Sequence, residues 1–386
     1  MSKRLIVWRE RLSRWLRGIK RPKPQPAPTP TPTPTPIGVY DVPPSIAADG
    51  SVDVTDAVNA WLRTVPNGTA LSPVTARFGA GATYRIHGSV GTSLNHPTET
   101  AGLNRQYMIW DGNGCTIDWS KNTPTPYANR AAIAMFNSIG MTVANFTTIG
   151  PWAKDWSNEG YQSDYEWQHG VAMFFGSHGG TIKNCSFHNS LGDSVSLSGS
   201  DNIVVENCVC DGTGRMGVAL TANDNVIIRG CTFDRISYHV IDIEPESEPH
   251  PVENITITGN TIKRHRFCFI GAESGVCSPR TNYVITNNTM EQPGLTSFPP
   301  IACASTIYST TLPVGQCTNN AATGLTVTGN VLRSTQNNGE VVRARGYSNV
   351  TVTGNTCYLD SPFADRAIVR FEACTGALAV SNNTLA

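Results

Sequence analysis

Apolar and polar residues alternate in short runs along the second half of the chain, and most runs end in Gly-Asn, Asn-Asn or a related pair. The alternation predicts half-buried β-strands, and the pair that follows predicts a tight turn. These runs occupy residues 181–187, 202–210, 225–233, 254–262, 282–290, 324–332, 349–357 and 377–385. Their regular return is typical of a repeat protein.

One position in each run defines a common register. We name these the turn positions: Cys185, Cys208, Cys231, Asn260, Asn288, Asn330, Asn355 and Asn383. A unit of this size cannot bury its own inward residues, so the copies are expected to stack as coils of a solenoid. Asparagine suits a stack because it tolerates the left-handed turn conformation and its amide can bond to the coils above and below. The three cysteines are expected to be small buried side chains and not metal ligands.

The pattern resembles the right-handed parallel β-helix of the pectin-lyase-like superfamily, in particular proteins of the bacterial and phage tail type. Residues 53–62 look like the short helix that caps such domains, and residues 77–88 and 108–119 are similar to their first coils. The resemblance implies an all-β, single-stranded right-handed parallel β-helix with a short N-terminal capping helix. It does not imply one chemistry, because this architecture hosts hydrolases, lyases, epimerases and adhesins.

Two segments precede this domain, which we place at residues 37–386. Residues 1–21 form a stripe of apolar side chains among arginines, which predicts a basic amphipathic helix. Its longest apolar run is too short for a signal peptide or a membrane span. The helix is therefore expected to dock onto a particle or tail protein or to lie on an anionic membrane. A solvated tail is the alternative. Residues 22–36 alternate proline with other residues and predict a Pro-Thr spacer about 45 Å long.

The formal net charge of zero hides an asymmetry. Residues 1–23 hold nine of the 29 Lys and Arg residues and one of the 29 acidic residues, which leaves the remainder acidic. Because the basic residues that would contact phosphates are concentrated in the arm, nucleic-acid binding is not expected.

Counting from the turn positions locates a candidate site. The tenth and twelfth residues are inward pairs: Val195 and Leu197, Val218 and Leu220, Ile241 and Ile243. The eleventh residue faces outward and is Ser196, Ala219 and then Asp242; the thirteenth is Ser198, Thr221, Glu244 and, one coil on, Glu273. Asp242 and Glu244 are therefore expected to share an outward face above small side chains.

Charged residues also cluster at the turn that enters this strand. His169, Asp193, Arg215 and His239 are predicted to form a column over four coils, with His169 beside Gly192 and Arg215. We interpret this column, flanked by Asp242 and Glu244, as a polysaccharide site. A salt-bridged solvent face is the alternative. The resemblance also implies that His169, Asp193, Arg215, Asp242 and Glu244 are the functional positions.

Two chemistries fit these residue types, and neither is expected to involve a cofactor or a metal ion. Glycoside hydrolysis needs one carboxylic acid and one carboxylate, which Asp193, Asp242 and Glu244 could supply. In a lyase, His239 or His169 would abstract a proton next to a uronate carboxylate that Arg215 neutralises. The adjacent Asp-Asp and Arg-x-Lys of polygalacturonases are missing from residues 37–386, so the resemblance assigns no sugar.

An aromatic insertion, residues 150–170, precedes the column. Trp152, Trp156, Tyr165 and Trp167 are predicted to stack on sugar rings, and Glu273 is predicted to contact the same substrate. A loop that packs its own rings into a lid is the alternative.

These observations predict a glycan-cleaving β-helix protein displayed on a virion, as part of a phage tail, or on a cell surface. The alternative is a non-catalytic minor tail, structural or receptor-binding protein. No cap follows Asn383, so a partner subunit or a second copy of the chain is expected to cover the last coil.

Overall fold

The computed structural model describes residues 38–92, 100–125, 130–152, 155–157, 163–244, 252–272, 280–295, 300–304, 322–334, 340–359, 367–372 and 374–385. All of them belong to one compact unit, Pro36–Ala386. The predicted basic arm (1–21) and Pro-rich linker (22–36) lie outside the described residues, so both stay predictions.

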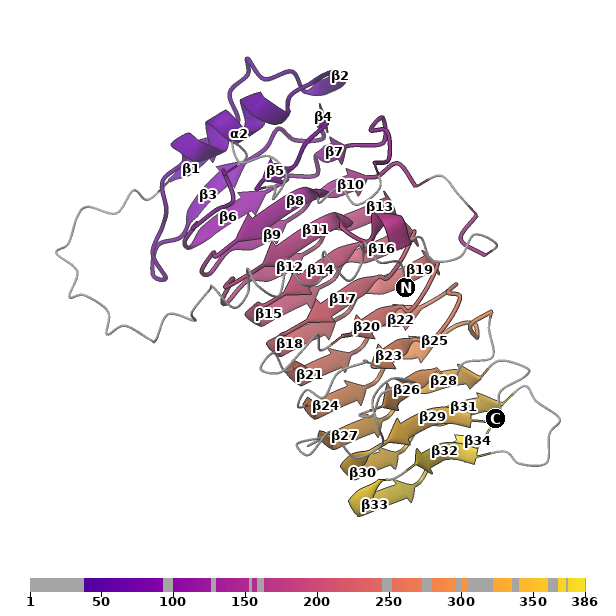
Figure 1. Ribbon diagram of the computed structural model, residues 1–386. Helices are drawn as coiled ribbons and strands as arrows, with labels where there is room; N and C mark the ends of the chain where they lie inside the picture. Colours follow the sequence, from indigo (N-terminus) through magenta and orange to yellow (C-terminus); the bar gives the residue numbers. More distant parts are fainter. Residues whose placement is uncertain are drawn as a thin grey trace. The chain divides into compact units, whose positions relative to one another are not determined.

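The strands lie in three parallel sheets (Figure 1). In spatial order, the first sheet holds β1 (Val39–Asp41), β3 (Val74–Arg77), β6 (Met108–Asp111), β9 (Thr142–Ala144), β12 (Thr181–Lys183), β15 (Asp201–Glu206), β18 (Asp224–Arg229), β21 (Val252–Thr258), β24 (Arg280–Thr286), β27 (Ala322–Thr328), β30 (Tyr347–Thr353) and β33 (Thr375–Ser381). The second holds β2 (Asp49–Asp53), β4 (Thr83–Arg85), β7 (Thr116–Asp118), β10 (Thr147–Ile149), β13 (Ser186–Ser190), β16 (Val209–Thr213), β19 (Thr232–Ile236), β22 (Thr261–Ile262), β25 (Thr289–Met290), β28 (Val331–Ser334), β31 (Thr356–Leu359) and β34 (Thr384–Leu385). The third holds β5 (Val90–Gly91), β8 (Arg130–Phe136), β11 (Gln168–Phe174), β14 (Val195–Ser198), β17 (Val218–Thr221), β20 (Ile241–Ile243), β23 (Ile270–Ala272), β26 (Ile301–Ala304), β29 (Glu340–Arg345) and β32 (Ala367–Glu372).

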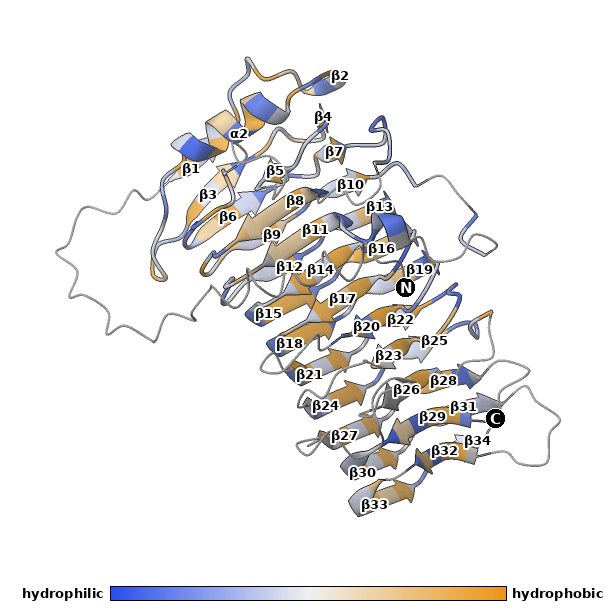
Figure 2. Cartoon of the chain, viewed as in Figure 1, coloured by the Kyte–Doolittle hydropathy of each residue, from blue (hydrophilic) through white to orange (hydrophobic). Residues whose placement is uncertain are grey.

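From β3 to β32 each coil contributes one strand to each sheet in turn, so that β12, β13 and β14 are followed by β15, β16 and β17. The register repeats the sequence pattern, since Val195 pairs with Val218 and Val218 pairs with Ile241. The inward pairs that the sequence predicts are fully buried (Figure 2 shows the hydrophobic residues that recur along the stacked strands). The predicted all-β, single-stranded parallel β-helix is therefore confirmed.

A short helix lies over the first coils, where the sequence predicts a capping helix. Helix α2 (Thr55–Thr64) buries Val58 and Leu62, and the ring of Trp61 packs edge-on against Phe78 at 5.1 Å. The Asp53 carboxylate before the helix accepts hydrogen bonds from the backbone N–H and the hydroxyl of Thr55. Within the part of the chain that the structure describes, no helix is both long and apolar enough to cross a membrane.

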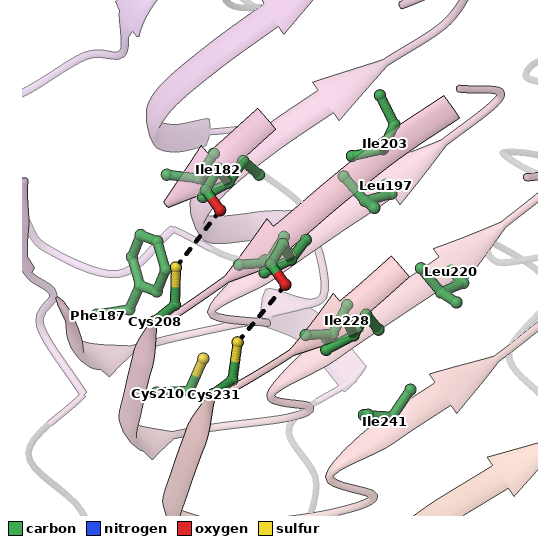
Figure 3. Close-up of a cluster of buried hydrophobic side chains, with 14 of the residues drawn as sticks. Ile182, Phe187, Leu197, Ile203, Cys208, Cys210, Leu220, Ile228, Cys231 and Ile241 are labelled. Carbon is green, nitrogen blue, oxygen red and sulfur yellow. Dashed lines mark hydrogen bonds between the residues drawn. The ribbon is translucent and has the colours of Figure 1, made fainter. Parts of the chain in front are cut away.

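The turn positions form one buried column, with thiols at its N-terminal end. Cys208 and Cys231 each point their sulfur at a carbonyl oxygen of the preceding coil, 3.7 Å away (Figure 3). Cys185, Cys208 and Cys231 are all about 1% exposed and belong to the main hydrophobic core. They behave as small buried side chains, as predicted.

Asparagines continue the column, and their amides bond from coil to coil. The Oδ1 of Asn288 accepts from both the backbone N–H and the Nδ2 of Asn260, at 3.0 and 2.9 Å. Its own Nδ2 donates to the Ile257 carbonyl and to Oδ1 of Asn330. These bonds satisfy polar groups that would otherwise be buried without partners.

One detail of the prediction is wrong. The left-handed conformation belongs to the residue before each turn position, not to the turn-position asparagine itself. Gly259, Asn287 and Gly329 have φ values of 64°, 55° and 66°. Glycine and asparagine reach this region at low cost, which explains why Gly or Asn so often precedes the turn position.

The last described coil exposes residues that face inward elsewhere. Leu378 pairs with Val350 and Val380 pairs with Val352, yet Leu378 and Val380 are 41% and 47% exposed whereas their partners are fully buried. The expected cover by a partner subunit or a second copy stays a prediction.

Candidate functional site

One row of positions on the outward face of the third sheet has a single acidic residue among small ones. From β11 to β26 the paired residues are Ala172, Ser196, Ala219, Asp242, Gly271 and Ala302. Asp242 is only 4% exposed, and Glu244, which follows β20, is half-buried. The alignment of Ser196, Ala219 and Asp242 is the one that the sequence predicts.

A buried charge cluster lies at the entrance to these strands. His169 Nδ1 is 3.2 Å from Asp193 Oδ2, and the guanidinium Nη1 of Arg215 is 3.6 Å from the same oxygen. Arg215 also donates to the Glu166 carbonyl at 3.0 Å. The side chains of His169, Asp193 and Arg215 are at most 7% exposed. The structure thus brings together three of the four residues of the predicted column.

Asp193 is held in its ionised form. Burial alone would raise its pKa, but the charge of Arg215 and the hydrogen bond from His169 outweigh burial and lower the pKa below its usual value. The backbone N–H of Met216 adds a hydrogen bond to Oδ1 at 3.3 Å. A carboxylate with these partners carries a stable negative charge at neutral pH.

Asp242 is shifted in the opposite direction. Burial is the main cause that raises its pKa well above the usual range, and the neighbouring Glu244 raises it further through its charge and a side-chain hydrogen bond. Arg215 lowers the pKa of Asp242 and Asp193 raises it, so the two groups of charges interact. Asp242 therefore keeps its proton at a pH at which Asp193 has lost it.

The predicted register of one member of the column, His169, was wrong by one residue. Val171 pairs with Val195, so His169 lies beside Asp193 and not beside Gly192. Arg215 is aligned with Tyr238, whose backbone N–H donates to the Arg215 carbonyl at 3.2 Å. The cause is one extra residue between β11 and β12: Phe174 pairs with Ser198 but Thr181 pairs with Val204, so this segment is one residue longer than the corresponding one between β14 and β15.

His239 belongs to a different group of side chains. Its ring lies 4.2 Å from the ring of Tyr238 and 5.8 Å from that of Phe267. A Cβ atom added to Gly271 would come within 2.8 Å of the His239 ring. Burial lowers the pKa of His239 to about 3, so the imidazole is neutral. The sequence analysis did not single out Tyr238 or Phe267, although both occupy the seventh place after a turn position.

The aromatic insertion divides into two kinds of side chain. Trp152 is 2% exposed, and a Cβ atom at Gly214 would lie 3.2 Å from its ring, so Trp152 packs between coils and offers no ring face to a sugar. Trp156, Tyr165 and Trp167 are half-buried, and the Trp167 ring lies 6.5 Å from that of His169. These three remain candidates for sugar contacts. Glu273 lies outside the described residues.

No group of three or more His, Cys, Asp or Glu side chains in the described ranges is arranged to hold a metal ion. This face carries carboxyl groups, a buried cation and aromatic rings.

A model of the right-handed β-helix region matches residues 109–290 of the chain. No curated protein matches it by sequence.

Several solved structures share its fold at low identity. PfbA, a surface adhesin of Streptococcus pneumoniae, is 15% identical, with 90% of this chain and 91% of PfbA covered and a TM-score of 0.61. A family 28 exopolygalacturonase of Yersinia enterocolitica is 11% identical, with 90% and 78% covered and a TM-score of 0.56. A tailspike protein mutant of the E. coli bacteriophage HK620, in complex with a pentasaccharide, is 15% identical, with 88% of this chain and 64% of the tailspike covered and a TM-score of 0.54. The protein is therefore a right-handed parallel β-helix protein.

Proposed function

We propose that the protein binds a polysaccharide along the outward face of its third sheet and hydrolyses it with Asp242 and Glu244. The observation that carries this proposal is the position of Asp242, the single acid in a row of small outward side chains, beside the more exposed carboxyl group of Glu244. Burial also raises the pKa of Asp242, as suits a carboxyl group that acts as an acid, and glycosidases use one carboxyl group as acid and a second as base or nucleophile.

In this proposal Asp242 donates its proton to the glycosidic oxygen as the bond to the leaving sugar breaks. Glu244 removes a proton from the water that adds to the other sugar, so one water is consumed and both new hydroxyl groups are completed. Asp242 lies on β20 and Glu244 directly follows that strand, so their Cα atoms are about 6.5–7 Å from each other. The hydrogen bond that joins the two carboxyl groups must open to admit the substrate.

The buried cluster has a supporting role. Asp193 is 1% exposed and cannot reach a sugar without rearrangement, but its charge and that of Arg215 both act on the pKa of Asp242. We assign His169, Asp193 and Arg215 as positioning residues that set the electrostatic environment of Asp242.

Hydrolysis is favoured over elimination because neither histidine is a suitable base. The pKa of His239 is lowered to about 3, so its imidazole accepts a proton only weakly. His169 is 1% exposed and its Nδ1 faces Asp193.

A non-catalytic receptor-binding protein is the second candidate, with display on a virion or a cell surface. It is supported by the resemblance in fold to a bacterial surface adhesin and to a phage tailspike. The basic arm and the Pro-rich linker of the sequence also fit such display. In that case Asp242 and Glu244 would contact sugar hydroxyl groups without cleaving a bond.

The test is a panel of polygalacturonate, alginate, dextran and a bacterial O-antigen polysaccharide. Reducing ends report hydrolysis, ultraviolet absorbance of unsaturated products reports elimination, and affinity electrophoresis reports binding. We expect Asp242→Asn and Glu244→Gln to lower the release of reducing ends by about 10²–10⁴-fold. Asp234→Asn is the matched control, because Asp234 is an outward acid on the second sheet that pairs with Arg264 at 2.6 Å.

Unchanged release of reducing ends by both site variants would refute the proposed hydrolysis. Unsaturated products from the wild-type protein would indicate a lyase. Retention without any product would leave the receptor-binding function.

A further inference from the structure

The rings of Tyr238 and Phe267 come from consecutive coils and lie side by side. Their centroids are 4.5 Å apart, with an angle of 49° between the ring planes, and the Phe267 backbone N–H donates to the Tyr238 carbonyl at 3.3 Å. Both residues are half-buried. We propose that these two rings, named here the aromatic strip, form a binding subsite for a pyranose residue of the polysaccharide. This inference rests on the proposed function and deepens it.

The aromatic strip borders the candidate site on two sides. On one side, Tyr238 follows directly after Arg215 in the stack of coils, and Arg215 contacts Asp193. On the other side, His239 fills the space between the strip and Gly271, the residue paired with Asp242. Tyr238 and Asp242 are four residues apart on one coil, so a sugar on the strip would lie within about 13 Å of the Asp242 residue along the strand direction.

The chemistry of the strip matches one face of a sugar ring. A pyranose presents axial C–H groups on a face that is nearly apolar, and aromatic rings bury such faces favourably while a tyrosine hydroxyl stays available for hydrogen bonds. The Arg266 guanidinium lies 5.8 Å from the centre of the Phe267 ring and helps to hold that ring in place. The residues paired with Asp242 on the two adjacent coils are Ala219 and Gly271. Their small side chains leave space above the sheet next to the strip.

In this arrangement His239 positions the aromatic strip relative to the third sheet. Its ring contacts Tyr238 and would clash with any side chain at Gly271, so it fixes the height of the strip above the sheet. A neutral imidazole suits this role, since a charged one would be poorly solvated there.

The test measures binding in the Asp242→Asn background, where a bound polysaccharide is not cleaved. Tyr238→Leu and Phe267→Leu are each added, and retention is measured by affinity electrophoresis on the panel member that the Asp242→Asn protein retains. We expect each change to weaken binding at least tenfold. Tyr358→Leu is the matched control, because Tyr358 is a half-buried ring on the second sheet with the Arg333 guanidinium 4.0 Å from its centre.

Thermal melting separates a lost contact from a lost fold, since all three leucine variants remove a half-buried ring. If a variant does not fold, hydroxyl-radical labelling of the Asp242→Asn protein replaces it, and we expect the polysaccharide to protect Tyr238 and Phe267 from oxidation. Unchanged affinity or unchanged labelling overturns the subsite and leaves the proposed function intact, provided that the wild-type protein cleaves the same polysaccharide. If the wild-type protein neither retains nor cleaves any member of the panel, the proposed function fails together with the subsite.

Discussion

The column of turn positions and the outward face of the third sheet run along the same coils, but from Asn260 onward the first repeats one residue type, whereas the second changes from small residues to an acid at one coil. In the column, Asn260, Asn288 and Asn330 repeat one hydrogen-bonding scheme from coil to coil. On the outward face, the run of small side chains is interrupted once between β11 and β26, by Asp242. Repetition in this fold indicates a structural role, and an interruption of the repeat indicates a site.

The first prediction compares two members of the column, and its expected effect is the largest. Asn288→Ala removes an acceptor for two donors of Asn260 and leaves the Ile257 carbonyl without its amide donor. Each unsatisfied buried group costs about 1–3 kcal/mol, so we expect a loss of roughly 4 kcal/mol in the free energy of unfolding. Urea denaturation measures it.

Cys208→Ala is the control at an equivalent position. The Cys208 thiol makes weak sulfur hydrogen bonds, to carbonyl oxygens at 3.3 and 3.7 Å and to the neighbouring thiols of the column, so we expect a loss of about 1 kcal/mol. Equal losses for the two variants would mean that the asparagine bonds add nothing specific to the column.

The second prediction moves to the charge cluster. Asp193→Asn leaves the Arg215 and His169 side chains buried without their carboxylate, and breaking such a pair costs about 3 kcal/mol at pH 7. The pKa of Asp193 is lowered, so the carboxylate stabilises the fold above the pKa of the unfolded chain and that stabilisation is lost as the pH falls through the folded value. The difference between wild type and variant should therefore shrink as the pH falls below 3.8, the unfolded value, and urea midpoints from pH 7 down to about pH 2 measure it.

The third prediction concerns Gly271. A methyl group there meets the His239 ring at 2.8 Å, so Gly271→Ala should cost about 2 kcal/mol through overpacking. Adding His239→Ala should relieve the clash, and a double-mutant cycle measures the coupling. Additive effects would show that the His239 ring does not limit the side chain at Gly271.

The fourth prediction has the smallest effect and the opposite sign. Asp242→Asn should stabilise the protein by about 1 kcal/mol at pH 7 while removing activity, because a residue kept for chemistry is often costly for the fold. The pKa of Asp242 is raised, so the neutral carboxyl group is fully compatible with folding below the unfolded value of 3.8, and stability is lost as the pH rises through the folded value.

The gain in the Asp242→Asn variant should accordingly be absent near pH 3.5 and largest at pH 7. Urea midpoints at the two pH values measure it. A variant that is less stable than wild type at pH 7 would contradict the protonated state assigned to Asp242.

The fold could be predicted because each coil repeats the same residue types at the same distance from its turn position. Val195, Val218 and Ile241 share one offset from their turn positions, and offsets within a coil are kept wherever no insertion intervenes. The same rule placed Asp242 in line with Ser196 and Ala219. It failed for His169, because the segment from Phe174 to Thr181 is one residue longer than the corresponding segment from Ser198 to Val204, so counting back from Cys185 shifts the register by one.

Protonation states and side-chain packing could not be predicted from the sequence, because they depend on burial and on neighbours from other coils. Whether Asp242 holds a proton depends on burial and on Glu244, and whether Trp152 faces a sugar depends on the space beside Gly214. Tyr238 and Phe267 could have been found by applying the register to the seventh place after Cys231 and Asn260.

The asparagine bonds join each coil only to its two neighbours, and this affects how the loops of the protein can change during evolution. Asn288 and Asn330 are 42 positions apart whereas Asn330 and Asn355 are 25 apart, yet the same amide bond joins both pairs. Loops of unequal length therefore leave the frame undisturbed. A lineage built on this frame can exchange one bordering loop at a time, and thereby acquire a new ligand, without having to evolve a new scaffold.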